Sequence, residues 1–147
     1  MDTLSLRPRK REEMPEQFKD TQKLLDAILQ ALWSKNAFHT VVLHVGKLTD
    51  ITDYFVIVSG RSDRHVMAIS DILQAQLKDK GVVPLGVEGK RASRWVLVDY
   101  GDVVVHIFEK ETRAFYDLER LWGDAERIEV QEPQWVKDFA RMESDEF

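Results

Sequence analysis

The stretch WVLVDYGDVVVHIFEKETRAFYDLERLW, from Trp95 to Trp122, decides the fold. It predicts two strands, 95–99 and 103–108, joined by a turn in which Gly101 can take a positive φ. Both runs are apolar almost throughout instead of alternating, which indicates a hairpin covered on both faces. A helix is expected directly after them, with a stripe towards the core made by Phe115, Leu118, Leu121 and Trp122.

The rest of the chain supplies two further helices and three further strands. Apolar residues at three- and four-residue spacing predict helices over 18–35 and 63–80, and Ser62 is expected to cap the second. Apolar runs predict strands over 40–45, 54–59 and 83–87. The order α-β-β-α-β-β-β-α predicts an α/β (α+β) fold in which a mixed sheet of about five strands is flanked by helices. A right-handed crossover through the second helix requires the strands on either side of it to be parallel.

The chain divides into an arm, one domain and a tail. Residues 1–16 contain two prolines and no apolar periodicity, and they are predicted to be a disordered arm. Residues 17–123 form the predicted domain. Residues 124–147 carry eight acidic and three basic residues, while the whole chain of 147 residues has a net charge of −5. The acidity is therefore concentrated in this tail, which could fold over the sheet, bind a partner or solubilise the chain.

The composition excludes several classes of protein. Hydrophobic residues make up 44% and charged residues 32%, which is typical of a soluble domain. No apolar run approaches the ~20 residues of a membrane helix, the N-terminus lacks the apolar region of a secretory signal, and there is no cysteine. These features favour a cytoplasmic protein. Little direct contact with RNA is expected, because the one basic cluster is short: Arg7, Arg9, Lys10 and Arg11.

Three patterns suggest chemistry, and each has a structural alternative. The turn Gly60-Arg61-Ser62 could bind a phosphate through backbone N–H groups, but Ser62 is more simply a helix cap. The pairs Asp50/Asp53 and Asp99/Asp102 could hold a metal, but close aspartates more often cap turns. His106 has no accompanying nucleophile motif, so a core or interface histidine is favoured over a general base. No catalytic residue, metal site or cofactor is predicted.

Trp95 is the remaining candidate. It opens a strand directly after the charged loop 90–94 and close to Glu88 and Gly89. Tryptophan is enriched among the anchors of protein interfaces, which favours a partly exposed position. The alternative is that Trp95 closes the end of the core, and these residues alone favour neither reading.

Two longer motifs resemble the signatures of the ribosomal silencing factor family, also called Iojap-like. The first is Asp50-Ile51-Thr52-Asp53-Tyr54-Phe55 followed by 58–62. The second consists of Glu88-Gly89, Trp95, Asp99-Tyr100-Gly101-Asp102, His106, Arg113, Tyr116, Leu118-Glu119 and Leu121-Trp122. Both have the expected order and spacing, and the resemblance covers residues 20–123.

The resemblance implies a fold related to nucleotidyltransferases but without their catalytic carboxylates, and so a protein that is not an enzyme. It implies binding to the large ribosomal subunit through ribosomal protein fourteen, on the face that meets the small subunit. Such binding would block subunit joining and lower translation under nutrient limitation. A role in large-subunit assembly is the alternative, and a nucleotidyltransferase-type enzyme is less favoured. A homodimer that forms away from the ribosome is also considered.

The expected binding surface follows from the charge of the chain. An acidic protein without a basic patch should dock on a basic protein component and not on RNA. An apolar anchor surrounded by acids would suit such a partner. The predicted partner-binding residues are therefore Trp95, Glu88, Gly89, Asp99, Asp102 and His106.

Overall fold

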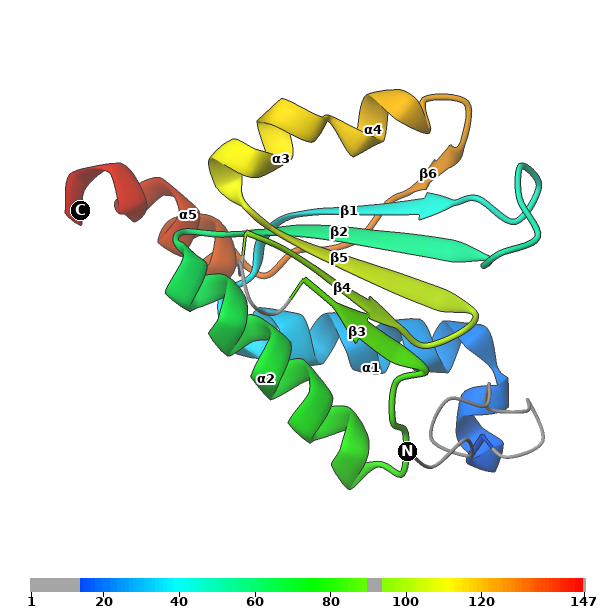
Figure 1. Cartoon of the computed structure of the whole chain (residues 1–147). Helices are drawn as coiled ribbons and strands as arrows, with labels where there is room; N and C mark the ends of the chain where they lie inside the picture. The colour runs from blue at the N-terminus through cyan, green and yellow to red at the C-terminus, as the bar shows by residue number, and fades with distance from the viewer. Residues whose placement is uncertain (1–13, 90–93, 147) are drawn as a thin grey trace.

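One mixed sheet of six strands forms the centre of the computed structural model, which describes residues 14–89 and 94–146 (Figure 1). The strands are β1 (Phe38–His44), β2 (Tyr54–Gly60), β3 (Gly86–Glu88), β4 (Trp95–Asp99), β5 (Val103–Glu109) and β6 (Glu126–Ile128). Their order across the sheet is β3-β4-β5-β2-β1-β6. The central pair, β2 and β5, is parallel, and every other neighbouring pair is antiparallel.

Two long helices cover one face of the sheet: α1 (Thr21–Ser34) and α2 (Asp63–Asp79) (Figure 1). A short 3-10 helix (Glu16–Lys19) precedes α1. The apolar stripes of both helices pack on the sheet to form the larger core, because residues three and four apart in a helix share a face. Fully buried members of this core include Leu24, Ile28, Leu32, Ile69, Leu73 and Leu77. The predictions of both helices are confirmed, and the Ser62 hydroxyl caps α2 by accepting from the N–H of His65 at 3.1 Å.

Two short helices, α3 (Lys110–Tyr116) and α4 (Leu118–Leu121), lie over the other face of the sheet (Figure 1). The core beneath them is smaller, and its fully or nearly buried members include Leu43, Ile57, Phe108 and Leu118. Strand β5 is buried along both faces, from Val103 to Phe108, as its unbroken apolar run predicts. Strand β4 alternates between buried and half-buried residues. Only part of this second face is therefore covered.

The prediction of a single helix after the hairpin is wrong, because the chain changes direction at Asp117 and forms two short helices. This residue has φ 46° and ψ 56°, a left-handed conformation that ends α3 and starts α4 in a new direction. The predicted stripe is broken as a result. Leu118 is buried and Trp122 packs on Phe55 with ring centroids 5.0 Å apart, but Phe115 and Leu121 are 81% and 77% exposed.

The residues after Gly123 add elements that the sequence analysis did not predict. Strand β6 pairs with β1, with Val42 opposite Ile128, and this makes the sheet six-stranded instead of five-stranded. Helix α5 (Gln134–Glu146) packs beside the end of β1, where Val136 is fully buried and Phe139 contacts Phe38. The acidic tail therefore folds onto the domain.

The strands on either side of α2 are parallel, as predicted, but they are not neighbours in the sheet. Strand β3 is antiparallel to β4, which is antiparallel to β5, so β3 points the same way as β2. It does not lie beside β2, because the hairpin of β4 and β5 is inserted between them. The predicted strand 83–87 is shorter and later, at Gly86–Glu88, since Pro84 has no N–H to donate to a ladder.

The described part of the chain begins before the predicted domain boundary. Met14 is 7% exposed and belongs to the larger core. The predicted disordered arm otherwise falls on residues 1–13, which lie outside the described residues.

Candidate functional site

Trp95 lies at the start of β4, on the half-covered face of the sheet. Its ring stacks on Phe108, with centroids 4.8 Å apart, and it contacts Tyr116 of α3 at 4.9 Å. The side chain is half-buried. Both interpretations of Trp95 therefore hold in part: its side chain closes one edge of the smaller core, and it remains partly accessible to solvent.

His106 lies underneath Trp95. The indole Nε1–H of Trp95 donates to Nδ1 of His106 at 3.1 Å, and the imidazole is 4% exposed. Phe55 meets the ring edge-on, with centroids 4.9 Å apart. Burial lowers the pKa of His106 to about 4, because an apolar environment disfavours the charged form. His106 is thus a neutral core histidine beneath the surface.

Glu88 and Gly89 reach the same end of the hairpin as Trp95. Glu88 is exposed at the end of β3, opposite Leu97 of β4. Gly89 has φ 87°, and a Cβ built on it would lie 2.0 Å from the carbonyl oxygen of Trp95. Only glycine fits there, which allows the chain to pass close to the Trp95 backbone.

Asp99 and Asp102 lie at the other end of the hairpin, away from Trp95 by the length of β4, about 13 Å at 3.3 Å per residue. Asp99 accepts from the N–H of Gly101 at 2.8 Å, so it caps the turn as predicted. The hydroxyl of Thr21 in α1 lies 3.5 Å from the Asp102 carboxylate. The structure therefore brings together Trp95, His106, Glu88 and Gly89, but it does not surround Trp95 with these two acids.

The residues that sequence reasoning missed are on α3 and α4. Phe115, Tyr116 and Leu121 are 81%, 53% and 77% exposed. Phe115 and Tyr116 line one cleft together with Trp95 and a second cleft together with Leu121. We call Trp95, Phe115, Tyr116 and Leu121 the apolar surface. The signal that could have revealed it was Asp117, since aspartate is among the few residues that adopt a left-handed conformation readily.

Charged side chains of both signs border the apolar surface. Arg94, Glu109 and Glu111 line the cleft beside Trp95, and Asp117 and Arg120 line the cleft beside Leu121. A contiguous exposed apolar area with a polar rim is typical of a protein-binding site.

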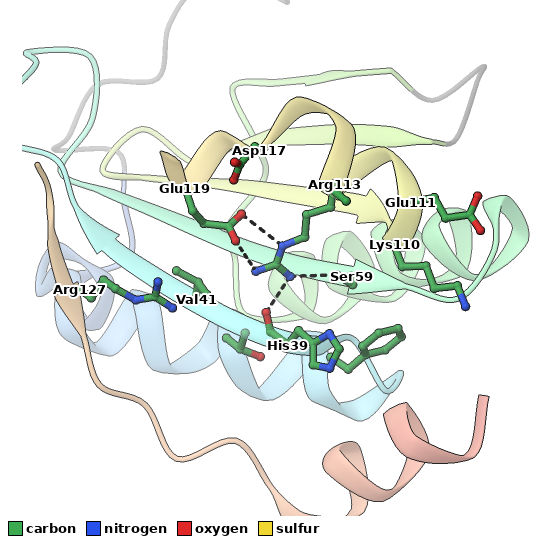
Figure 2. Close-up of a pocket in the computed structure, with 12 residues that line it drawn as sticks. His39, Val41, Ser59, Lys110, Glu111, Arg113, Asp117, Glu119 and Arg127 are labelled. Carbon is green, nitrogen blue, oxygen red and sulfur yellow. Dashed lines mark hydrogen bonds and ion pairs between the residues drawn. The ribbon is translucent and has the colours of Figure 1, made fainter. Parts of the chain in front are cut away.

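A larger cleft of about 820 Å³ lies on the other side of α3, between that helix and the bulge in β1 (Figure 2). Buried Arg113 forms its floor and donates four hydrogen bonds. Nη1 donates to the carbonyl of His39 at 2.7 Å and to the Ser59 hydroxyl at 2.8 Å. Nε and Nη2 donate to the Glu119 carboxylate at 3.2 and 3.3 Å. A guanidinium cannot take a proton from Ser59, so this is not a nucleophile–base pair. Arg113 and Glu119 instead fasten the α3–α4 corner to the sheet.

The turn at Gly60-Arg61-Ser62 and the start of α2 use two of their N–H groups internally, as the helix-cap interpretation expects. The N–H of Arg61 donates to Nδ1 of His65 at 2.9 Å, and the N–H of His65 donates to the Ser62 hydroxyl. Ser62 is the N-cap of α2. Among the described residues, no three His, Asp or Glu side chains come together as a metal site would require.

In the parts of the chain that the structure describes, no helix is both long and apolar enough to cross a membrane.

The comparisons with known proteins agree on one family. The family model described as "Ribosomal silencing factor during starvation" matches residues 18–146. The ribosomal silencing factor RsfS of Halalkalibacterium halodurans is 41% identical over 110 residues, which cover 75% of this chain and 94% of that protein. The mouse protein "Mitochondrial assembly of ribosomal large subunit protein 1" is 39% identical over 101 residues, covering 67% of this chain and 44% of that protein.

A solved structure supports the same relation. The crystal structure of a protein from Bacillus halodurans superposes with a TM-score of 0.67 and 38% sequence identity, covering 74% of this chain and 99% of that one. The family match includes β6 and α5, which the two sequence signatures did not reach. The chain belongs to the family of ribosomal silencing factors.

Proposed function

We propose that this chain represses translation by binding the large ribosomal subunit through the apolar surface. The partner on the subunit would be ribosomal protein fourteen, on the face that meets the small subunit, in the cytoplasm. The single observation that carries the proposal is the exposure of Phe115, Tyr116 and Leu121 beside a half-buried Trp95. The names of the relatives, silencing factors and a large-subunit assembly protein, support a ribosomal role without enzymatic activity.

The chemistry of the surface favours a protein partner over RNA. The chain has a net charge of −5, and among the described residues the rim of the apolar surface mixes both signs. RNA recognition draws most of its affinity from positive charge on phosphates. Exposed aromatic side chains are the usual anchors of protein–protein interfaces.

The mechanism needs no reaction. A folded body bound at the intersubunit face would occupy the space that the small subunit needs, and joining would fall in proportion to occupancy. The protein would be used stoichiometrically, and its release would restore joining.

Co-sedimentation with purified bacterial large subunits tests the proposal. The variants Phe115→Ala and Leu121→Ala remove highly exposed side chains, so they should leave the fold intact. Each is expected to weaken binding about tenfold, the effect of removing an interface anchor worth about 1.4 kcal/mol. The matched control is Trp135→Ala on α5, because Trp135 is 57% exposed but lies outside the apolar surface. Unchanged binding by both surface variants would refute this assignment of the interface.

Large-subunit assembly is the second candidate, favoured by the name of the mouse relative. The two roles differ in the particle that is bound. A silencing factor should bind mature large subunits and release them to small subunits only when it dissociates, whereas an assembly factor should prefer precursor particles. Sedimentation of the protein alone at micromolar concentration tests whether two copies pair through the same surface when no subunit is present.

A further inference from the structure

The only polar atom of the Trp95 side chain does not face a partner. Its indole N–H is bonded to Nδ1 of His106, which is buried, and its ring rests on Phe108. What Trp95 can offer to a docking protein is therefore carbon surface alone. The bond also restricts rotation of the indole, because turning the ring away would leave the buried Nδ1 without its donor.

The chemistry of His106 suits the role of a permanent acceptor. Since Nδ1 accepts the indole N–H, the proton of the neutral ring must be on Nε2. Burial lowers the pKa of His106 to about 4, so the ring stays neutral near pH 7 and Nδ1 keeps its lone pair.

Stability alone does not explain an imidazole at this position. Nε2 of His106 is buried and has no hydrogen-bond partner among the residues that the structure describes. A buried donor without an acceptor costs free energy, and an aromatic hydrocarbon ring of similar size would avoid that cost. The neighbouring rings of Phe55 and Phe108 show that such side chains are accommodated in this core.

We propose that His106 is a positioning residue for the apolar surface: it holds Trp95 in one rotamer and keeps the indole N–H out of the contact area. The inference rests on the proposed function, because it assumes that Trp95 meets a partner. It also specifies the chemistry of that partner. The segment that packs on Trp95 presents an apolar side chain, or the aliphatic stem of a lysine or arginine, and not a hydrogen-bond acceptor.

The first test uses the protein alone. The chain has four tryptophans, so a spectrum of ¹⁵N-labelled indole groups should show four N–H signals, and Trp95→Phe identifies the one that belongs to Trp95. We expect this proton to exchange slowly with water in the wild type and in His106→Asn, whose side-chain oxygen can also accept at the δ position. In His106→Phe the proton should exchange as fast as an exposed indole. Equal exchange in the wild type and His106→Phe would overturn the proposal.

The second test measures binding to purified bacterial large subunits. His106→Phe should weaken binding about threefold to tenfold while remaining folded, since one neutral hydrogen bond preorganises the anchor. His106→Asn should stay within about twofold of the wild type. In a Trp95→Phe background, which lacks the N–H, His106→Phe should cause no further loss. The assignment would be contradicted if His106→Phe bound large subunits as tightly as the wild type, or if His106→Asn bound as weakly as His106→Phe. It would also be contradicted if the affinity losses of His106→Phe and Trp95→Phe multiplied in the double variant.

The two tests separate this proposal from the proposed function. If the wild-type chain does not bind large subunits, the proposed function fails, and the indole exchange of the protein alone still decides whether His106 holds Trp95. If binding occurs through the apolar surface but the effects of His106→Phe and Trp95→Phe on affinity are independent, only the role proposed for His106 fails.

Discussion

Two histidines, buried His106 and partly buried His65, each have a fixed proton position. His65 accepts the N–H of Arg61 at Nδ1, and its Nε2–H donates to the carbonyl of Lys35 at 2.8 Å, so it ties the start of α2 to the end of α1. Burial is the main cause that lowers its pKa; the bond to the Lys35 carbonyl opposes the shift, and the charges of Arg61 and Lys35 add to it. His106, with its pKa near 4, is more strongly affected. Both residues make the folded state prefer neutral imidazole.

The stability of the protein should therefore fall as the pH falls below about 6.5. Between pH 6.5 and 4 the unfolded chain binds a proton at His106 that the folded chain does not, so the free energy of unfolding rises with pH across this window. The contribution of His106 to stability is complete above pH 6.5 and is lost as the pH falls towards 4. His106 should account for a loss of about 2 to 3 kcal/mol between pH 7.5 and 4.5. Urea unfolding of the wild type and of non-titrating His106→Asn at both pH values measures this. An identical loss in the two proteins would contradict the prediction.

Gly89 should tolerate no side chain. With φ 87° and the Trp95 carbonyl oxygen 2.0 Å from a built Cβ, Gly89→Ala must strain the backbone and move the start of β4. We expect a cost of about 2 kcal/mol or more. Gly86→Ala is the matched control, because nothing lies within 4 Å of its Cβ position, and it should change stability by less than about 0.5 kcal/mol. Similar melting curves for both variants would show that the backbone at Gly89 can relax.

Residue-level expectations succeeded where the deciding interactions are local. Ser62 caps α2, Asp99 caps the hairpin turn, and Gly101 has φ 89°, all within a few positions in sequence. The exposure of Trp95 depends on Phe108 and on Tyr116, which the α3–α4 corner places. No local pattern specifies that packing, so the sequence left it open.

At the scale of elements, the corner between α3 and α4 creates the apolar surface. A helical stripe with a period of 3.6 residues would have buried Phe115 and Leu121 together with Leu118. The left-handed residue Asp117 redirects the axis, so Leu118 and Trp122 pack on the sheet while Phe115 and Leu121 are exposed. The predicted stripe failed at Phe115 and Leu121 because periodicity assumes an unbroken helix, and one residue broke it.

The ion pair that holds this corner should be important for stability. Arg113 is 8% exposed, and loss of its Glu119 partner would leave a buried guanidinium without its counter-charge. Glu119→Gln should cost roughly 2–4 kcal/mol, somewhat less than a fully buried pair because Glu119 is partly exposed. Glu16→Gln, which breaks an exposed pair with Lys19, is the control and should be nearly neutral. Chemical denaturation measures both, and a neutral effect of Glu119→Gln would show that the hydroxyl and carbonyl contacts of Arg113 suffice.

Helix α5 should be part of the cooperative fold and not a loose appendage. Val136 is fully buried against the larger core, whereas the next residue, Lys137, is exposed. Val136→Ala should cost about 2 kcal/mol through the lost contacts and the cavity, and Lys137→Ala about 0.5 kcal/mol or less. Thermal unfolding checks this. A Val136→Ala variant as stable as the wild type would mean that α5 separates from the domain before the rest unfolds.

For the whole molecule, the sequence predicted the content of the sheet better than its arrangement. All five strands of the residues before Gly123 were found, because long apolar runs such as 103–108 are distinct in sequence. Which strands pair with one another could not be deduced from the sequence, since the pairing of β2 with β5 joins residues nearly 50 positions apart (Tyr54 with Val103). The sixth strand has three residues, Glu126–Ile128, two of them charged, and its pairing with β1 rather than its composition makes it a strand.

The proposed function predicts stoichiometric inhibition. If a bound chain blocks subunit joining by occupying the joining face, inhibition should saturate at about one chain per large subunit and should not increase with incubation time. Titration of the protein into a subunit-joining assay followed by light scattering measures this. The Leu121→Ala variant should need about tenfold more protein for the same inhibition. Progressive inactivation by substoichiometric amounts would contradict a steric mechanism.

The position of β1 in the sheet also has a consequence for biosynthesis. Val42 emerges early from the translating ribosome, yet one of its neighbours is Ile128, and the residues nearest to Phe38 include Phe139. The nascent polypeptide cannot complete this side of the sheet until those distant residues have been translated, which is a contact pattern of high sequence separation. A growing copy of the protein therefore acquires its full tertiary structure only near the end of its own elongation, and until then chaperones would find the apolar side of β1 uncovered.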